Sequence, residues 1–144
     1  MKKKVSHFTR EPLNVIKQYN DDELDKKWDC EDDFQYEALR FIYSIVHPDE
    51  LIEVAAIAGG SARLSLRAAG KLKMMGVRAG VYDLMLLWRG GNIAFIELKA
   101  GSYPSLAQKE FGGYLESTSH RGCVCRTLRD IKRFLVRLGL ALRV

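Results

Sequence analysis

The chain has 144 residues and a hydrophobic fraction of 47%, which fit one globular domain with one sheet and a few helices. Its net charge of +5 suits a polyanionic partner, although many unrelated domains are equally basic. No apolar run approaches the length of a membrane span, and an odd number of cysteines excludes a simple disulfide framework. We therefore expect a cytoplasmic protein with free thiols and no membrane partner.

The first part of the chain predicts an arm followed by a helix. Residues 1–29 are polar and carry mixed charges, which indicates an irregular N-terminal arm with a short helical piece around Pro12–Tyr19. From Cys30 to Val46, apolar residues recur at spacings of three and four, and this pattern predicts a helix that ends before Pro48.

The middle of the chain alternates between strand and helix signals. Leu51–Ala58 predicts a strand, and the basic segment Leu64–Met75 predicts a helix with Gly76 just beyond its last turn. Tyr82–Trp88 and Ile93–Leu98 are two apolar runs joined by a turn with two glycines, which predicts a hairpin. Because both runs are almost continuously apolar, we expect helices on both faces of the sheet.

The last third predicts a helix over Ser105–Ser117 capped by Ser105, a short strand over Gly122–Arg126 and a helix over Thr127–Leu138. Residues 30–144 are therefore expected to form a single α/β domain. Its predicted core is a mixed sheet of about four strands flanked by helices.

Three charged residues stand at one end of the predicted hairpin. Asp83 opens the first strand, and Glu97 and Lys99 close the second. A register symmetric about Gly90, with an odd number of turn residues, places Asp83 across from Glu97 on the same face. Lys99 shares that face because it lies two residues beyond Glu97.

Two carboxylates held this close repel one another, and a divalent metal removes that cost. Mg²⁺ or Mn²⁺ prefers a few carboxylate oxygens and several waters, which Asp83 and Glu97 can supply, with the backbone carbonyl of Leu98 as a further ligand. Lys99 is then placed to stabilise charge on a phosphate or to position the attacking water. The pattern predicts in-line attack of water on a phosphodiester.

Taken alone, the D…ELK pattern resembles the PD-(D/E)XK nucleases, but an exposed Asp–Lys pair at the end of a sheet would be the better explanation of so short a match. The neighbouring segments resemble the VRR-NUC family, the virus-type replication-repair nucleases, over about residues 31–136. The matching segments, in order, are Glu31…Gln35, the glycine-bounded basic stretch 69–83, Ile96-Glu97-Leu98-Lys99 and Leu106-Ala107-Gln108.

This resemblance implies a restriction-endonuclease-like α/β fold and Mg²⁺- or Mn²⁺-dependent cleavage of DNA that is often branched or flapped. Members of the stand-alone viral type resemble Holliday junction resolvases of DNA repair and recombination, and they tend to be homodimers. The chain departs from the family at Tyr82, where proline is usual. Proline would only fix the local backbone, so Asp83 remains the candidate ligand.

Two further residues acquire expected roles from the resemblance. Glu31 is the candidate for the family's helix glutamate, an outer or second metal ligand, because a helical wheel turns it inward and turns Glu37 outward into solvent. Alternatively, Glu31 lies just before the helix and only favours its positive end. Gln108 is expected to position the attacking water, a phosphate or the scissile strand, and its alternative is an exposed helix glutamine.

Basic residues just before Asp83 are predicted to guide the DNA backbone, with an ordinary solvated face as the alternative. The last helix offers a second basic surface for DNA or a partner. The first group consists of Arg63, Arg67, Lys71, Lys73 and Arg78, and the second of Arg126, Arg129, Lys132, Arg133 and Arg137.

The sequence therefore predicts a metal-dependent DNA endonuclease. Three alternatives stay open: an RNA-cleaving enzyme on the same fold, a non-catalytic DNA-binding module, and a structural protein whose D…ELK match is coincidental.

Overall fold

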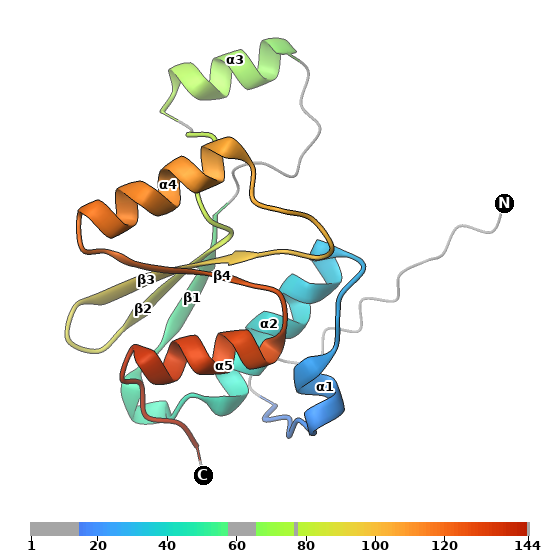
Figure 1. The fold of residues 1–144 in the computed structure, drawn as a ribbon. Helices are drawn as coiled ribbons and strands as arrows, with labels where there is room; N and C mark the ends of the chain where they lie inside the picture. The colour runs from blue at the N-terminus through green and yellow to red at the C-terminus, as the bar shows by residue number, and fades with distance from the viewer. Residues whose placement is uncertain (1–14, 58–65, 77, 144) are drawn as a thin grey trace, which may run out of the picture.

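The computed structural model describes residues 15–57, 66–76 and 78–143, with the backbone alone for residues 66–69. The described residues form a four-stranded mixed sheet flanked by helices (Figure 1), which confirms the predicted α/β class. The helices are α1 (Asp21–Asp25), α2 (Glu31–Ile45), α3 (Leu66–Met74), α4 (Leu106–Ser117) and α5 (Leu128–Arg137), with a 3₁₀ turn at Pro48–Glu50. The strands are β1 (Glu53–Ala56), β2 (Leu84–Trp88), β3 (Asn92–Leu98) and β4 (Arg121–Cys125).

The strands lie in the order β1-β2-β3-β4, with antiparallel pairing except between β3 and β4, which are parallel. In the hairpin, Leu84 pairs with Ile96 and Trp88 pairs with Asn92. The three-residue turn between them contains Gly90 at φ 91° and Gly91 at φ 73°, which are left-handed values that glycine adopts without strain. The predicted register, symmetric about Gly90, is confirmed.

Alternating residues of the hairpin divide between two unequal layers. Leu84, Leu86 and Ile96 are fully buried on the face that α2 and α5 cover. On the other face, α4 covers β3 and β4, but Leu87 and Ile93 remain 36% and 40% exposed. The expected full coverage of both faces is therefore wrong for this part of the described sheet, because α4 packs on Phe95 and Val124 and does not reach the turn end of the hairpin.

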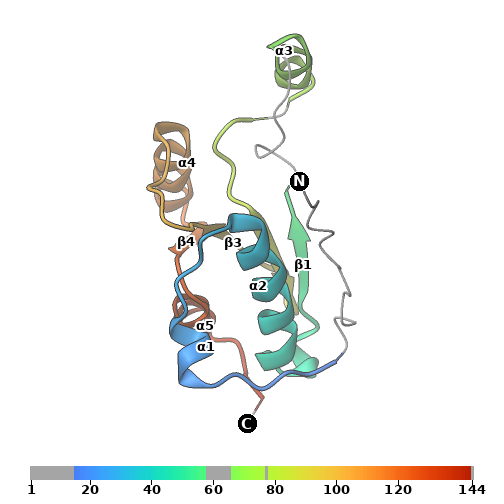
Figure 2. The ribbon, with the colours of Figure 1, turned by 90° about the vertical axis from the view of Figure 1, so that its right-hand side faces the viewer.

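The N-terminal arm is helical at a different place from the one predicted. Residues 15–19 are not helical, and residues 12–14 of the predicted piece lie outside the described residues. The helix α1 begins after Asn20 instead. The Asn20 side chain accepts a hydrogen bond from the Glu23 backbone N–H, while the Glu23 side chain accepts one from Asn20 N–H, so the two residues cap the helix reciprocally. The arm packs on the core through buried Leu24 and through Tyr19, which contacts Phe41 edge to face. Figure 2 shows α1 next to α5.

The other predicted helices and strands begin and end within two residues of the predicted bounds. Two of those bounds, the strand end at Ala58 and the helix start at Leu64, lie outside the described residues. The 3₁₀ turn was not predicted, and it is capped by the His47 side chain, which accepts the Asp49 N–H. All three cysteines are free thiols, as expected. Among the described residues, no helix is long and apolar enough to cross a membrane.

The packing of the arm predicts that Leu24→Ala lowers the free energy of unfolding by about 2 kcal/mol, because it removes a buried side chain and leaves a cavity. Urea denaturation measures this change. The matched control is Leu106→Ala, at a position 73% exposed, which should change stability by less than about 0.5 kcal/mol. Equal stability of the two variants would contradict a packed arm.

Candidate active site

The paired ends of β2 and β3 bring two carboxylates together. The backbone N–H of Asp83 donates to Glu97 Oε2 at 3.2 Å, and the N–H of Leu98 donates to Asp83 Oδ2 at 2.9 Å. The two carboxyl groups are close enough for the negative charge of Asp83 to raise the pKa of Glu97. Asp83 and Glu97 therefore share one face of the hairpin, as the register predicts.

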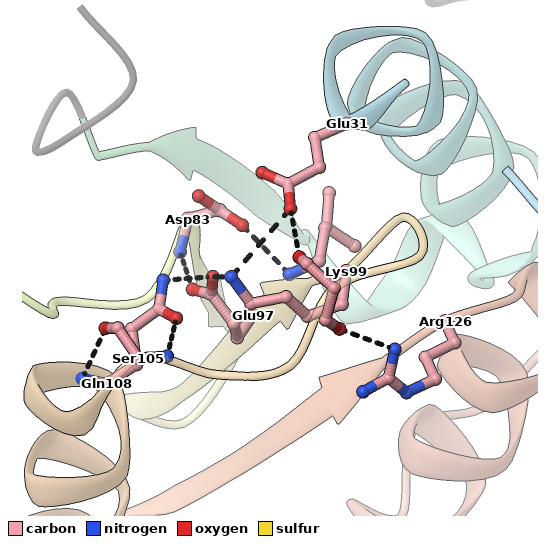
Figure 3. A network of polar contacts seen from close by, with 9 residues as sticks. Glu31, Asp83, Glu97, Lys99, Ser105, Gln108 and Arg126 are labelled. Atoms are coloured by element: carbon pink, nitrogen blue, oxygen red, sulfur yellow. Dashed lines mark hydrogen bonds and ion pairs between the residues drawn. The ribbon is translucent and has the colours of Figure 1, made fainter. Parts of the chain in front are cut away.

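Lys99 completes the cluster from the end of β3 (Figure 3). Its Nζ lies 3.4 Å from Glu97 Oε1 and 3.8 Å from Glu31 Oε1, and its side chain is only 8% exposed. Glu31 is the first residue of α2 and is 44% exposed, so it lies at the rim of the cluster. Glu31 therefore lies inside the first turn of α2, not before the helix, and it faces Lys99. Its role as a metal ligand stays a prediction.

Glu37 does not point into solvent as the helical wheel predicts. Its Oε1 accepts hydrogen bonds from Lys17 Nζ at 2.9 Å and from the Tyr19 hydroxyl at 2.8 Å. The prediction is wrong because the N-terminal arm lies over this side of α2, and a wheel drawn on one helix cannot include a segment that packs from elsewhere.

Gln108 links the start of α4 to the cluster. Ser105 caps the helix as predicted: its Oγ accepts the Gln108 N–H, and Gln108 Oε1 accepts the Ser105 N–H in return. The other end of the same amide, Nε2, donates to Glu97 Oε1 at 2.6 Å. Gln108 thus meets Glu97 directly, and it holds this carboxylate and the helix in one arrangement.

The segment leading into Asp83 is fixed by close packing. Gly80 has φ +83°, and a Cβ at this position would overlap the backbone of Ala107 in α4. Tyr82, at the position where a proline was expected, is 6% exposed. Its ring contacts that of Phe111 edge to face, with 5.2 Å between the ring centroids. Packing of the Tyr82 ring under α4 therefore fixes the backbone that a proline would otherwise restrain.

Burial perturbs both carboxyl groups, and a neighbouring negative charge adds to its effect on each. Burial, followed by the negative charge of Asp83, raises the pKa of Glu97 from its ordinary value of 4.5 to about 7. Burial also raises the pKa of Asp83, and the negative charge of Glu31 raises it further. The hydrogen bond from the Leu98 N–H acts in the opposite direction and lowers it. Lys99 opposes both increases but supplies only one positive charge, so an additional cation would stabilise the ionised pair.

The available oxygen atoms fit a hard divalent cation. Asp83 accepts a backbone hydrogen bond from Leu98 through Oδ2, which leaves further lone pairs of this carboxylate for a cation. The Leu98 carbonyl faces the same side as its own N–H, toward Asp83, because both groups of a strand residue point one way. No three Asp, Glu, His or Cys side chains within the described ranges form a complete ligand set. Mg²⁺, however, is commonly bound by one or two carboxylates with waters in the remaining positions.

The predicted DNA-guiding cations have different surroundings. Arg63 lies outside the described residues, and the side chain of Arg67 is not described. Lys71 and Lys73 are exposed on α3. This helix stands apart from the sheet, beyond the edge at which β1 ends and β2 begins (Figures 1 and 2). The guanidinium of Arg78 lies over two aromatic rings of α4, at 5.4 and 5.5 Å from their centres.

Sequence reasoning missed a residue at the rim of the site. Ser102 Oγ donates to Glu31 Oε1 at 3.4 Å, and the Ser102 carbonyl accepts from Arg126 Nη1 at 2.8 Å. The local signal for a sharp turn beside Ser102 was the glycine at position 101. In the structure Gly101 adopts φ +75° in the loop after β3.

Comparison of the chain with known proteins found no matching family model, curated protein or solved structure. The chemistry of the site is therefore inferred from its own side chains.

The raised pKa of Glu97 predicts that the metal-free protein loses stability as pH rises. Between pH 4.5 and about 7, the folded state retains a proton that the unfolded state releases, so the free energy of unfolding falls over this window. The decline is expected to be on the order of 1–3 kcal/mol. It is measured by urea denaturation in EDTA across the same pH range.

Glu97→Gln should remove most of this decline. Glu110→Gln, which changes an exposed glutamate of α4, is the matched control and should leave the decline as it is in the wild type. Parallel pH profiles for the wild type and Glu97→Gln would contradict the perturbed pKa.

Proposed function

We propose that this protein is a metal-dependent endonuclease that hydrolyses phosphodiester bonds in DNA. The observation that carries the proposal is the pair of carboxylates, Asp83 and Glu97, held across two strands with the ammonium group of Lys99 beside them. This combination of two acids and one amine, at the end of an otherwise apolar hairpin, suits phosphate chemistry better than it suits stability, since each group is costly to bury alone.

Asp83, Glu97 and the Leu98 carbonyl would hold Mg²⁺ or Mn²⁺, with Glu31 as an outer ligand. When bound, such an ion would lower the pKa of a coordinated water and would place positive charge near the phosphate.

The protein's own groups would act by orientation and charge. Gln108 Nε2 and the Asp83 N–H fix the two oxygens of Glu97, so this carboxylate is oriented before any substrate arrives. Lys99 can donate a hydrogen bond to a phosphate oxygen or to the attacking water. Its low exposure strengthens that interaction, because fewer waters screen the charge.

The restriction-endonuclease-like form of this fold, and branched or flapped DNA as the substrate, belong to the same proposal. The supporting features are the mixed sheet with its polar cluster at the ends of β2 and β3, and the order of the motifs that resemble the VRR-NUC family. Exposed Lys71 and Lys73, beyond that end of the sheet, are suited to contact phosphates.

Cleavage assays on four-way junction, flap, nicked and linear duplex DNA in Mn²⁺ test this proposal, with RNA substrates in parallel. Lys99→Ala is expected to lower the cleavage rate at least about 100-fold while leaving DNA affinity largely unchanged. Lys109→Ala, at an exposed lysine of α4, is the matched control and should retain activity.

Each contrary result has a distinct meaning. Equal activity of Lys99→Ala and the wild type would remove Lys99 from the mechanism. Salt-sensitive DNA binding without cleavage in Mg²⁺ or Mn²⁺ would identify a non-catalytic module, and cleavage of RNA alone would change the substrate.

We further propose that the protein acts as a homodimer, because cutting two strands of a branched substrate suits two-fold symmetry. Light scattering at working concentrations should then give twice the chain mass of 16.4 kDa. A monomeric mass with full activity on four-way junctions would contradict this arrangement.

A further inference from the structure

The solvent-facing side of α5 is strongly basic, whereas its other side is part of the core. Leu128, Ile131 and Leu135 are buried against the sheet and α2. Arg129 is neutralised by two carboxylates of α1. The other cations of α5, and Arg126 just before the helix, have no carboxylate within 4.0 Å among the residues that the structure describes. We call these four residues the basic track: Arg126, Lys132, Arg133 and Arg137.

This accumulation of charge is unfavourable for the helix itself. Arg133 is one turn from both Arg129 and Arg137, and like charges at this spacing destabilise a helix. The one acid in the segment, Asp130, does not offset them fully, because its Oδ2 accepts the backbone N–H groups of Arg126 and Thr127 as part of the helix cap. A polyanion along this side would remove the repulsion.

A groove of about 730 Å³ lies between the basic track and β4, with Val124 and Val136 among its lining residues. β4 is an edge strand of the sheet. The Cys125 carbonyl accepts the Lys99 N–H on the β3 side, so the neighbouring Val124 N–H points the opposite way, toward the open edge. Guanidinium groups and outward backbone N–H groups are the donors that proteins present to phosphates.

The basic track is continuous with the candidate active site. The Arg126 side chain donates a hydrogen bond to the backbone carbonyl of Ser102. The hydroxyl of Ser102 in turn donates one to the carboxylate of Glu31. From Leu128 to Arg137, α5 extends by about 14 Å, and Arg126 lies two residues before its first turn. This length corresponds to four steps of about 3.4 Å, or about five nucleotides, along one strand of DNA.

We propose that α5 and the β4 edge form a second DNA-binding surface, which holds the sugar–phosphate backbone of about five nucleotides to one side of the cleavage site. The position of the cleavage site rests on the proposed function, but binding to this surface does not require catalysis. A second copy of the chain is a poor occupant, because two such faces would repel each other. An acidic protein segment is the rival that the experiment must exclude.

The test uses Lys132→Gln combined with Arg133→Gln, since both residues are exposed and neither contacts the carboxylate cluster. The matched control is Lys27→Gln combined with Arg89→Gln, which removes the same charge from exposed positions outside α5. Affinity for a linear DNA duplex is measured without divalent metal over a range of salt concentrations. Thermal unfolding checks that both variants remain folded.

The basic-track variant is expected to bind at least about tenfold more weakly at low salt, with its slope of log affinity against log salt reduced by about 1.8, or 0.9 for each lost phosphate contact. The control should keep the wild-type slope. Equal reductions in both variants would overturn the proposal, because binding would then follow net charge alone. Binding of poly-glutamate but not of DNA would overturn it in favour of an acidic protein partner.

The two proposals can fail separately. Cleavage by the wild type, with an unchanged salt slope in the basic-track variant, would retain the endonuclease and remove this surface. A reduced slope, without cleavage by the wild type in Mg²⁺ or Mn²⁺, would retain the surface and remove the endonuclease.

Discussion

The register of the β2–β3 hairpin is the constraint on which the candidate site depends. Side chains alternate along a strand, so a slip of one residue would turn Asp83 away from the face that carries Glu97. The three-residue turn, with Gly90 and Gly91 at positive φ, selects this register. The reciprocal hydrogen bonds between the two carboxylates and the facing backbone N–H groups then reinforce it.

The same register imposes an electrostatic cost that explains the surroundings of the pair. A buried carboxylate, Glu97, and a half-buried one, Asp83, share one ammonium group from Lys99 and amide donors from Gln108 and the backbone, which compensate for burial only in part. The excess of negative charge lies inside the molecule, whereas α3 and α5 carry an excess of positive charge outside. A cation bound by the pair and a polyanion bound along the helices would offset both imbalances together.

The sequence predicted those features that local patterns determine. Periodicity predicted the core helices, and the paired glycines predicted the hairpin register and hence the convergence of Asp83, Glu97 and Lys99. Contacts made by distant segments escaped prediction: Lys17 and Tyr19 hold Glu37, although a helical wheel assigned this residue to solvent. An apolar strand likewise cannot reveal how far a covering helix extends, so the open half of the outer sheet face was missed.

Gln108 illustrates how helix capping and site chemistry restrict one position together. A capping box accepts either glutamate or glutamine at this position, because only an acceptor is needed for the N-cap N–H. Here the far side of the same group faces Glu97 Oε1, where a second carboxylate would repel it. An amide satisfies both partners, with its oxygen toward Ser105 and its nitrogen toward Glu97. The start of α4 and the orientation of Glu97 are therefore coupled through one side chain, and the choice of glutamine at this position has a physical reason.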